Sequence, residues 1–292
     1  MTQLEHEEIK VIVRERYGDL ARQAAADGED CCGPSCCVSE ADAGGEDCCG
    51  PSCCASEADA ETAMPLYTAG ETEGLPAEAL AASAGCGNPT ALASLREGET
   101  VIDFGSGGGI DCFLAARAVG EQGRVIGIDM TQDMIDLARS NAGKVGLSNT
   151  EFYHAEMERT PVDDDTADIL ISNCVINLAP DKDAVFREAF RVLKPGGRLM
   201  VSDMVLMETL PEEQATDTSN WVACLAGAEL KAVYLGRIAD AGFADVEVVS
   251  ETRLDAGDGW RSSVRSMNIK ATKPPRDTAG TDARRGVPAT GR

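Results

Sequence analysis

From residue 100 onward, short apolar runs alternate with amphipathic stretches, and this alternation restricts the possible folds more than any other feature of the chain. Strands are predicted at 100–104, 124–130, 150–155, 167–175 and 198–205. Helices are predicted between them at 110–119, up to residue 145 and at 181–193. Parallel strands need helical connections, so we expect a doubly wound, mostly parallel α/β sheet with helices on both faces.

The segments on either side of these units have a different character. A helical pattern occupies residues 1–27, and further helices (211–226, 229–241) and strands (243–250, 263–271) predict a smaller C-terminal α+β region. The residues from 273 onward have the composition of a disordered tail. We therefore divide the chain into an N-terminal helix (1–27), a flexible Cys-rich segment (28–61), a sheet domain (62–205), a C-terminal region (206–272) and a tail (273–292).

A glycine-rich loop, DFGSGGG at 103–109, follows the first predicted strand and opens the first predicted helix of the sheet domain. Glycines in such a turn let the backbone approach a bound nucleotide closely. The dinucleotide fingerprint is not met, because its last position falls on Ile110 or Cys112. Asp129 ends the second predicted strand, where a carboxylate accepts hydrogen bonds from ribose hydroxyls. The loop resembles that of Rossmann-like class I methyltransferases, which cradles the amino-acid end of S-adenosylmethionine.

This resemblance implies S-adenosylmethionine as the methyl donor, held by the loop and by residues at the strand ends. Glu156 and Met157 follow the third strand, where they would line the adenine, and Asn173 lies beside the site. The predicted cofactor residues are Asp103, Gly105, Ser106, Gly107, Gly109, Asp129, Met130, Glu156, Met157 and Asn173. A Rossmann-like domain for another nucleotide is the alternative, although the chain shows neither a nicotinamide pattern nor a P-loop lysine.

Three cysteines stand next to predicted strands. Cys86 precedes the first strand in the tight loop GCGNP, Cys174 ends the fourth strand in SNCVINL, and Cys224 lies on a predicted helix in WVACLAGA. Open α/β sheets bind ligands at the carboxyl ends of their strands, where these thiols would meet only through folding. Cys112, on the helix behind the glycine loop, is expected to be a core residue instead.

The segment from about residue 62 to 270 resembles the arsenite S-adenosylmethionine methyltransferases. The resemblance is carried by GCGNP, DFGSGGGIDCFLAA, IGIDMTQDMIDLAR, ISNCVINLAPDK, FREAFRVLKPGGR and ACLAGA. It implies that Cys86, Cys174 and Cys224 bind trivalent arsenic. The C-terminal region at 206–272, which contains Cys224, would then cap the acceptor. The resemblance also implies that a cysteine near the N-terminus takes part in disulfide exchange during turnover, and we expect one from the 31–37 cluster to pair with Cys86.

Arsenic chemistry agrees with this assignment. Arsenic(III) is a soft electrophile that prefers thiolates, and three thiolates leave its lone pair directed away from the sulfurs. If the lone pair faces the sulfonium methyl, transfer needs positioning and no base, because arsenic has no proton to lose. Each transfer formally raises arsenic to the pentavalent state, so further rounds need a thiol reductant of the thioredoxin or glutathione type. Two alternatives remain open, a methyltransferase for a small organic acceptor and a non-catalytic metalloid-binding protein.

A direct repeat holds eight of the twelve cysteines. GEDCCGPSCCVSEADA at 28–43 recurs at 45–60 with a single change, Val38 to Ala55, and is too short and polar to bury a core. Its thiols suit As(III), Zn(II) or Cu(I), so metalloid capture, a redox role and no role all stay open. These accessory thiols are Cys31, Cys32, Cys36, Cys37, Cys48, Cys49, Cys53 and Cys54.

The charge of the chain bears on its partners and its surroundings. A net charge of −24 argues against nucleic acid, whose phosphates need Lys and Arg. No apolar run is long enough for a bilayer and the N-terminus lacks a secretory pattern, so we expect a cytoplasmic protein with no membrane contact. An acidic, lysine-poor surface favours a halophilic cytoplasm, where salt screens self-repulsion. We expect a monomer.

Overall fold

The computed structural model describes residues 6–30, 67–215, 220–221, 224–253 and 259–276. The eight cysteines of the duplicated segment and the tail from 277 onward lie outside the described residues, so the predictions for them stay predictions. Within the described part, no helix has the length and apolar character that crossing a membrane requires.

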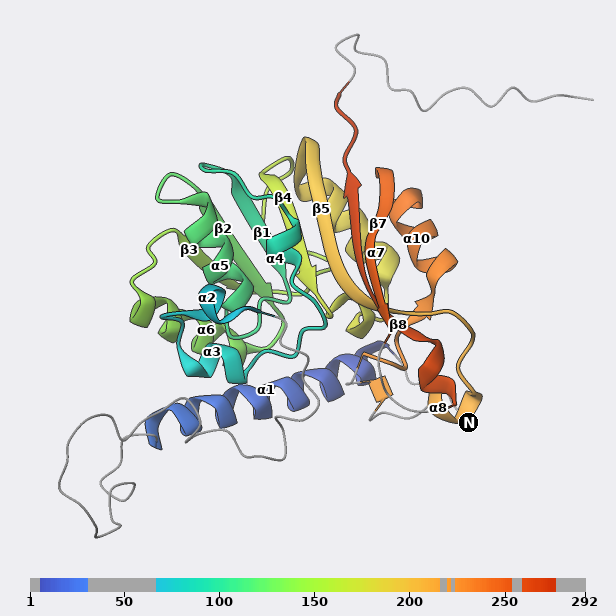
Figure 1. Cartoon of the computed structure of the whole chain (residues 1–292), viewed down its shortest axis with the longest axis horizontal. Coiled ribbons are helices and arrows are strands. Elements are labelled where there is room, and N and C mark those ends of the chain that lie inside the picture. Colours follow the sequence, from blue (N-terminus) through green and yellow to red (C-terminus); the bar gives the residue numbers. More distant parts are fainter. Residues whose placement is uncertain (1–5, 31–66, 216–219, 222–223, 254–258, 277–292) are drawn as a thin grey trace, which may run out of the picture.

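The centre of the molecule is an eight-stranded sheet. Its strands are β1 Thr100–Phe104, β2 Arg124–Asp129, β3 Thr150–His154, β4 Ala167–Asn173, β5 Leu193–Leu206, β6 Glu229–Leu230, β7 Ala244–Arg253 and β8 Val264–Thr272. The order is β3-β2-β1-β4-β5-β8-β7, with the short β6 paired to β5 (Figure 1). The first five strands in this order run parallel, and β8 is antiparallel to both of its neighbours. The expected mostly parallel sheet is confirmed.

Helices cover both faces of this sheet. The helices of the described part are α1 His6–Asp30, α2 Ala69–Thr72, α3 Ala77–Ala81, α4 Pro89–Leu92, α5 Ile110–Val119, α6 Gln132–Val145, α7 Lys182–Val192, α8 Glu212–Ala215 and α10 Lys231–Asp240, with 3-10 turns η1 Ile176–Leu178 and η2 Trp260–Ser263. Alternate strand residues point to opposite faces. Val101 therefore packs with residues of α5 and α6, whereas its neighbour Ile102 packs with residues of α7 and α10. This is the doubly wound arrangement.

Two elements differ most from their predicted bounds, and several others differ by one to three residues at an end. β5 begins at Leu193 rather than at 198, because the KPGG residues extend it through a register shift opposite Ala167 and Ile169. The Gly196 amide supports this extension by donating to Lys273 O at 2.8 Å. Of the helix predicted at 211–226, the described residues show α8 and residues 220–221 as helical, and 216–219 and 222–223 lie outside the described part.

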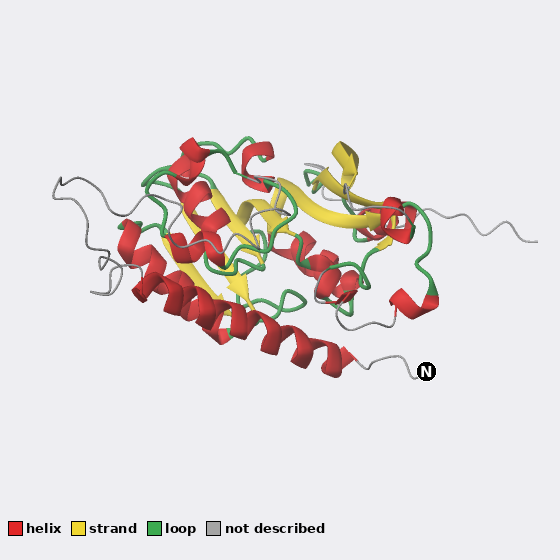
Figure 2. Cartoon of the chain, turned by 60° about the horizontal axis from the view of Figure 1, so that its bottom comes forward, coloured by secondary structure: helices red, strands yellow, loops and turns green. Residues whose placement is uncertain are grey.

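The long helix α1 lies across the carboxyl edge of the sheet (Figures 1 and 2). It contacts α3, α6 and η1. Ala21 joins Met134 of α6 in one apolar cluster, and Val13 joins Leu178 of η1 in another. The helix therefore covers the ends of the strands, where a doubly wound sheet binds its ligands.

Candidate active site

The glycine loop forms a cradle between β1 and α5. Gly105, Gly107 and Gly109 have φ angles of 74°, 48° and 96°, in the left-handed region that glycine adopts at little cost. Gly105 also lies against Val175, and an added Cβ would come within 2.6 Å of the Val175 Cβ. The Gly105 amide donates to Ile128 O of β2 at 2.8 Å. Both the conformation and the close packing therefore require glycine at position 105.

A pocket opens beside this cradle, at the carboxyl ends of β1, β2 and β4. Residues Gly105–Gly108 line one side of it, and Asp129 and Met130 line another, together with Met157. The Ser106 Oγ is buried in this loop and has no hydrogen-bond partner among the described residues. A buried hydroxyl ordinarily has such a partner, so the cradle has an unmet polar group for a ligand to satisfy.

Asp129 ends β2 with its carboxylate in the pocket wall. Its Oδ2 accepts from the Gly107 amide at 3.0 Å, and its Oδ1 accepts from the Thr131 amide at 2.8 Å. Burial raises the pKa of Asp129, although these two amides favour the charged form. A carboxylate has about four lone-pair sites. Asp129 therefore keeps acceptor capacity toward the pocket.

Asp103 and Gly109, both predicted cofactor residues, lie outside the pocket wall. Asp103 is 1% exposed, and its Oδ2 accepts from Cys112 Sγ at 3.3 Å. Burial raises the pKa of Asp103 well above its ordinary value. Gly109 precedes α5 as its N-cap. These two residues shape the loop from behind, and Cys112 is a core residue as expected.

Glu156 does not line the pocket either, in contrast to the predicted adenine contact. Its carboxylate pairs with Lys10 and Arg14 of α1, each at 2.7 Å, and the adjacent Met157 lines the pocket instead. Lys10 also lies 3.2 Å from Glu158, and both of these residues reach the pocket wall. Glu156 thus fastens α1 over the site.

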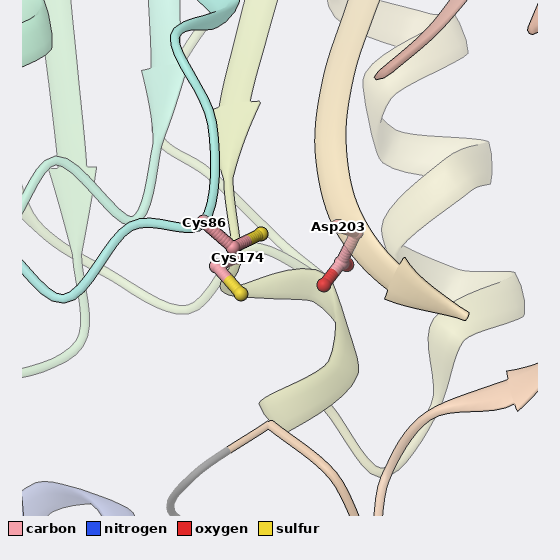
Figure 3. Close-up of side chains that lie close together, drawn as sticks. All are labelled: Cys86, Cys174 and Asp203. Carbon is pink, nitrogen blue, oxygen red and sulfur yellow. The ribbon is translucent and has the colours of Figure 1, made fainter. Parts of the chain in front are cut away.

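Three cysteines from distant parts of the chain meet at the end of β4. Cys174 follows β4 directly and lines the pocket, and Cys86 comes from the loop between α3 and α4. The two Sγ atoms and a carboxylate oxygen of Asp203 all lie within 4.8 Å of one another (Figure 3). The Sγ of Cys224 donates to Cys174 O at 2.8 Å. The structure therefore brings the three predicted thiols together, and their role as arsenic ligands stays a prediction.

Cys224 lies in a turn and not on a helix, which corrects the sequence-based expectation. Its amide donates to Trp221 O at 2.9 Å, and its φ of 60° is left-handed. Cys174 has a similar φ of 59°. A helical residue at 224 would direct its side chain differently, so the turn is what places this thiol against Cys174.

Hydrogen bonds within the cluster and burial favour protonated thiols. The bonds with Cys224 and Cys86, and then burial, raise the pKa of Cys174 well above its ordinary value. Burial also raises the pKa of Cys86. Cys86 and Cys174 are therefore thiols rather than thiolates at neutral pH in the free protein.

Asn173, predicted to lie beside the cofactor, connects the pocket to the Cys86 loop. Its Oδ1 accepts from the amides of Cys86 and Gly87 at 3.0 and 3.2 Å. Its Nδ2 donates to Gly87 O at 2.8 Å and to Asp111 Oδ2 at 3.0 Å. Because Asn173 and Asp111 both line the pocket, one amide joins the pocket wall to the loop that carries a thiol.

Several residues of the pocket wall were not predicted from the sequence. Lys10, Val13 and Tyr17 of α1 line the pocket, and burial beside the thiols raises the pKa of Tyr17 well above its ordinary value. The helical periodicity of α1 was visible in the sequence, but it gave no indication of where the helix lies. Asp111 opens α5 and accepts from the Tyr67 hydroxyl at 3.1 Å. Its place directly after the glycine loop was the available signal.

Asp203 was also not among the site residues predicted from the sequence. It is fully buried on β5, within the apolar run LMVSDMVL. A carboxylate in a buried strand is unusual enough to mark a site, and this was the signal that could have found it.

The chain is similar to known methyltransferases. Residues 95–258 match the family model described as a methyltransferase domain. An arsenite methyltransferase of Halobacterium salinarum is 38% identical over 287 residues, which cover 93% of this chain and 68% of that protein. Another, of Aquipseudomonas alcaligenes, is 41% identical over 151 residues, which cover 49% of this chain and 43% of that protein.

A solved structure resembles the chain in both fold and sequence. It is the crystal structure of an arsenic(III) S-adenosylmethionine methyltransferase from Chlamydomonas reinhardtii, with a TM-score of 0.58 and 35% identity. The match covers 65% of this chain and 67% of that one. With its class I methyltransferase fold, its glycine cradle and its similarity along most of its length to the Halobacterium protein, the chain belongs to the arsenite methyltransferase family.

Proposed function

We propose that this protein transfers methyl groups from S-adenosylmethionine to arsenite held by Cys86, Cys174 and Cys224, which detoxifies arsenic. The observation that carries the proposal is the thiol cluster at the pocket wall, where Cys174 faces the pocket and lies beside the other two thiols. Arsenic(III) prefers soft sulfur ligands, and three thiolates complete its coordination. A single buried cysteine would be an ordinary core residue, whereas three at one strand end form a binding site.

The pocket residues fit S-adenosylmethionine as the methyl donor. The glycine cradle and the unpartnered Ser106 hydroxyl suit its amino-acid end, and Asp129 suits its ribose. Met130 and Met157 would lie against its adenine. When bound, this molecule supplies an electrophilic methyl group on a sulfonium. The protein's part is to bring Cys174, and any acceptor on it, to the wall of the same pocket.

The protonated thiols have the right form for loading arsenite. Three Cys–SH groups and As(OH)₃ give three As–S bonds and three waters, each thiol proton leaving with a hydroxide. No side chain needs to act as a net base, and the raised pKa values of Cys86 and Cys174 are compatible with the reaction. Three ligands fix the direction of the arsenic lone pair, so the site contributes by positioning.

The C-terminal region from 206 to 272 supplies one of the three thiols and packs around them. Cys224 and Val264 belong to the same apolar cluster as Cys174, and Trp221 and Trp260 pack against it. We propose that this region and α1 enclose the acceptor and keep water from it. The division of the chain at residues 27, 61, 205 and 272 is part of this proposal.

The setting in which the enzyme works is also proposed. Cys86, Cys112, Cys174 and Cys224 are free, which suits a reducing cytoplasm, and the acidic composition suits high salt. A thiol reductant of the thioredoxin or glutathione type would return arsenic to the trivalent state. We also propose that the enzyme acts as a monomer.

Arsenic speciation tests the proposal directly. Purified protein would receive arsenite, S-adenosylmethionine and a thiol reductant in high salt, and chromatography with mass detection would separate the products. We expect methylated arsenic from the native protein and from Cys112→Ser, a control at a buried cysteine outside the cluster, but none from Cys174→Ser. Arsenite binding without consumption of the donor would indicate a metalloid-binding protein. Donor binding without arsenic methylation would point to a small organic acceptor.

A further inference from the structure

Asp203 is a buried carboxylate next to the thiols that the proposed reaction leaves without a role. One of its oxygens lies within 4.8 Å of the Sγ atoms of both Cys86 and Cys174, and Figure 3 shows its side chain on the strand beside them. It is absent from the pocket wall that would receive the methyl donor. It therefore lies on the acceptor side of the site.

Four hydrogen-bond donors hold Asp203 in place. Its Oδ1 accepts from Asn177 Nδ2 at 2.8 Å and from the Met204 amide at 2.9 Å. Its Oδ2 accepts from the Tyr234 hydroxyl at 2.9 Å and from the Asn177 amide at 3.2 Å. Three of these donors are N–H groups that cannot accept, so the arrangement suits the ionised carboxylate.

The same four bonds exclude two other roles for Asp203. A carboxylate has about four lone-pair sites, and here each is engaged by a donor. None is left to take a proton from a thiol or to coordinate arsenic. What Asp203 offers the site is a fixed negative charge at short range.

No cation among the described residues forms an ion pair with this charge. Lys182 is buried nearby and its charge partly offsets the effect of burial on the pKa of Asp203, but its Nζ donates to the carbonyls of Ala179 and Asn177, at 3.2 and 3.5 Å. Burial raises the pKa of Asp203 to about 6, so the group is charged at neutral pH at a cost to the folded state. A charge kept buried at such a cost beside a reaction centre calls for a functional reason.

The proposed methyl transfer creates a charge that Asp203 can stabilise. Arsenic held by three thiolates is neutral, and the methyl donor carries one positive charge on its sulfur. The arsenic lone pair forms the As–C bond while the C–S bond breaks, and its electron pair stays on sulfur, which becomes a neutral thioether. Arsenic is formally oxidised from As(III) to As(V) and now carries the positive charge.

We propose that Asp203 stabilises the positive charge that develops on arsenic during methyl transfer. This inference rests on the proposed function. The charge leaves the donor pocket, from which Asp203 is absent, and arrives among the thiols that Asp203 faces. The attraction is therefore stronger in the transition state than in the ground state, which is the condition for an interaction to accelerate the reaction.

Asp203→Asn tests the charge, and Tyr234→Phe is the matched control. The asparagine keeps the shape of the side chain and removes its charge, and its NH2 group faces an N–H donor that the carboxylate accepted from. The phenylalanine removes one of the four hydrogen bonds and leaves the charge. Arsenite affinity would be read from tryptophan fluorescence, because both tryptophans pack against the apolar cluster that includes Cys174 and Cys224. The methylation rate would be measured in a single turnover of arsenite-loaded enzyme.

We expect Asp203→Asn to bind arsenite with native affinity and to methylate it about 100-fold more slowly, the size of effect seen when one charge-stabilising group is removed. Tyr234→Phe should stay close to native in both measurements. An unchanged rate in Asp203→Asn would overturn the inference, and so would an equal loss of rate and affinity, which indicates a positioning role. A loss in Tyr234→Phe as large as in Asp203→Asn would also overturn it.

A second variant and the activity of the native protein complete the test. If Asp203→Asn does not fold, Asp203→Ser removes the charge with a smaller side chain, and the same slow rate with retained affinity is expected. If the native protein itself neither binds nor methylates arsenite, the proposed function fails. If the native protein is active and the Asp203 variants match its rate, only the present inference fails.

Discussion

Replacing Gly85 with alanine tests whether the Cys86 loop must stay hydrogen-bonded to Asn173 for Cys86 to serve as an arsenic ligand. Gly85 does not have a left-handed φ, so alanine is acceptable to the backbone and acts only through its Cβ. That Cβ would lie 2.7 Å from both Cγ and Oδ1 of Asn173, well inside van der Waals contact. The Asn173 amide cannot yield, because it is bonded to Cys86, Gly87 and Asp111. The Cys86 loop must therefore move.

The expected size of the effect follows from overpacking. An extra carbon in a well-packed site costs about 1–3 kcal/mol. If arsenite binding has to restore the native loop, this cost appears as a loss of arsenite affinity of about 5- to 150-fold, since 1.4 kcal/mol is tenfold. Fluorescence titration with arsenite would measure it, and urea unfolding would show whether the fold itself is weakened.

Gly143→Ala is the matched control for this experiment. Gly143 lies in the exposed part of α6, where an added Cβ meets nothing within 4 Å. We expect this variant to bind arsenite normally and to gain about 0.5–1 kcal/mol of stability, because alanine is the better helix former. Equal arsenite affinities in the two alanine variants would refute the reasoning that Asn173 holds the Cys86 loop in place.

Glu156, Cys112 and Asp203 each give one further prediction. Glu156→Gln should lower the free energy of unfolding by about 1 kcal/mol through its part-exposed pairs with α1, and Lys10→Met should produce much of the same loss. A double-mutant cycle measured by urea unfolding would show that the effects of the Glu156 and Lys10 variants are coupled. A large loss of S-adenosylmethionine affinity in Glu156→Gln would instead support the predicted contact of Glu156 with the adenine. Cys112→Ala should cost about 1 kcal/mol of stability and leave arsenic methylation intact, as measured by speciation. Because folding raises the pKa of Asp203 from 3.8 to about 6, its contribution favours the folded state below pH 3.8 and is lost as the pH rises through 6. The loss is about 3 kcal/mol in all, about 1 kcal/mol of it between pH 5 and 7. Asp203→Asn should lack this component when unfolding is compared at the two pH values, and a native-like pH dependence in the variant would contradict it.

Local sequence signals were enough to place the sheet and its nearest helices. The strand at 100–104 and the helix at 110–119 have the predicted bounds, because an apolar run, a glycine loop and an amphipathic stretch follow one another without interruption. The convergence of Cys86 and Cys174 did not follow from the topology, because Cys174 ends β4 whereas Cys86 precedes the start of the parallel strand β1. Only the resemblance to a known family implied that these thiols meet.

What could not be predicted depends on contacts between distant segments. The periodicity of α1 indicates a helix and an apolar face, but the partners of Lys10 and Arg14 are more than 140 residues away. Glu156 was therefore predicted to contact the adenine, whereas its carboxylate forms ion pairs with α1. Cys224 was placed on a helix because WVACLAGA has helical composition, whereas its backbone turns left-handed to meet Cys174.

The backbone at two of the three thiols is itself a sign of preorganisation. Cys174 and Cys224 both lie in the left-handed region, which costs a non-glycine residue about 1–2 kcal/mol. Glycine would avoid this cost but would supply no thiol. Cys174 cannot relax, because its amide donates to Ser202 O of β5 at 2.7 Å and its neighbour Asn173 is held by the Cys86 loop. The free-energy cost of this strain falls on folding and not on arsenic binding. The thiols are therefore already in position in the free protein, and arsenic binding loses little free energy to ordering them.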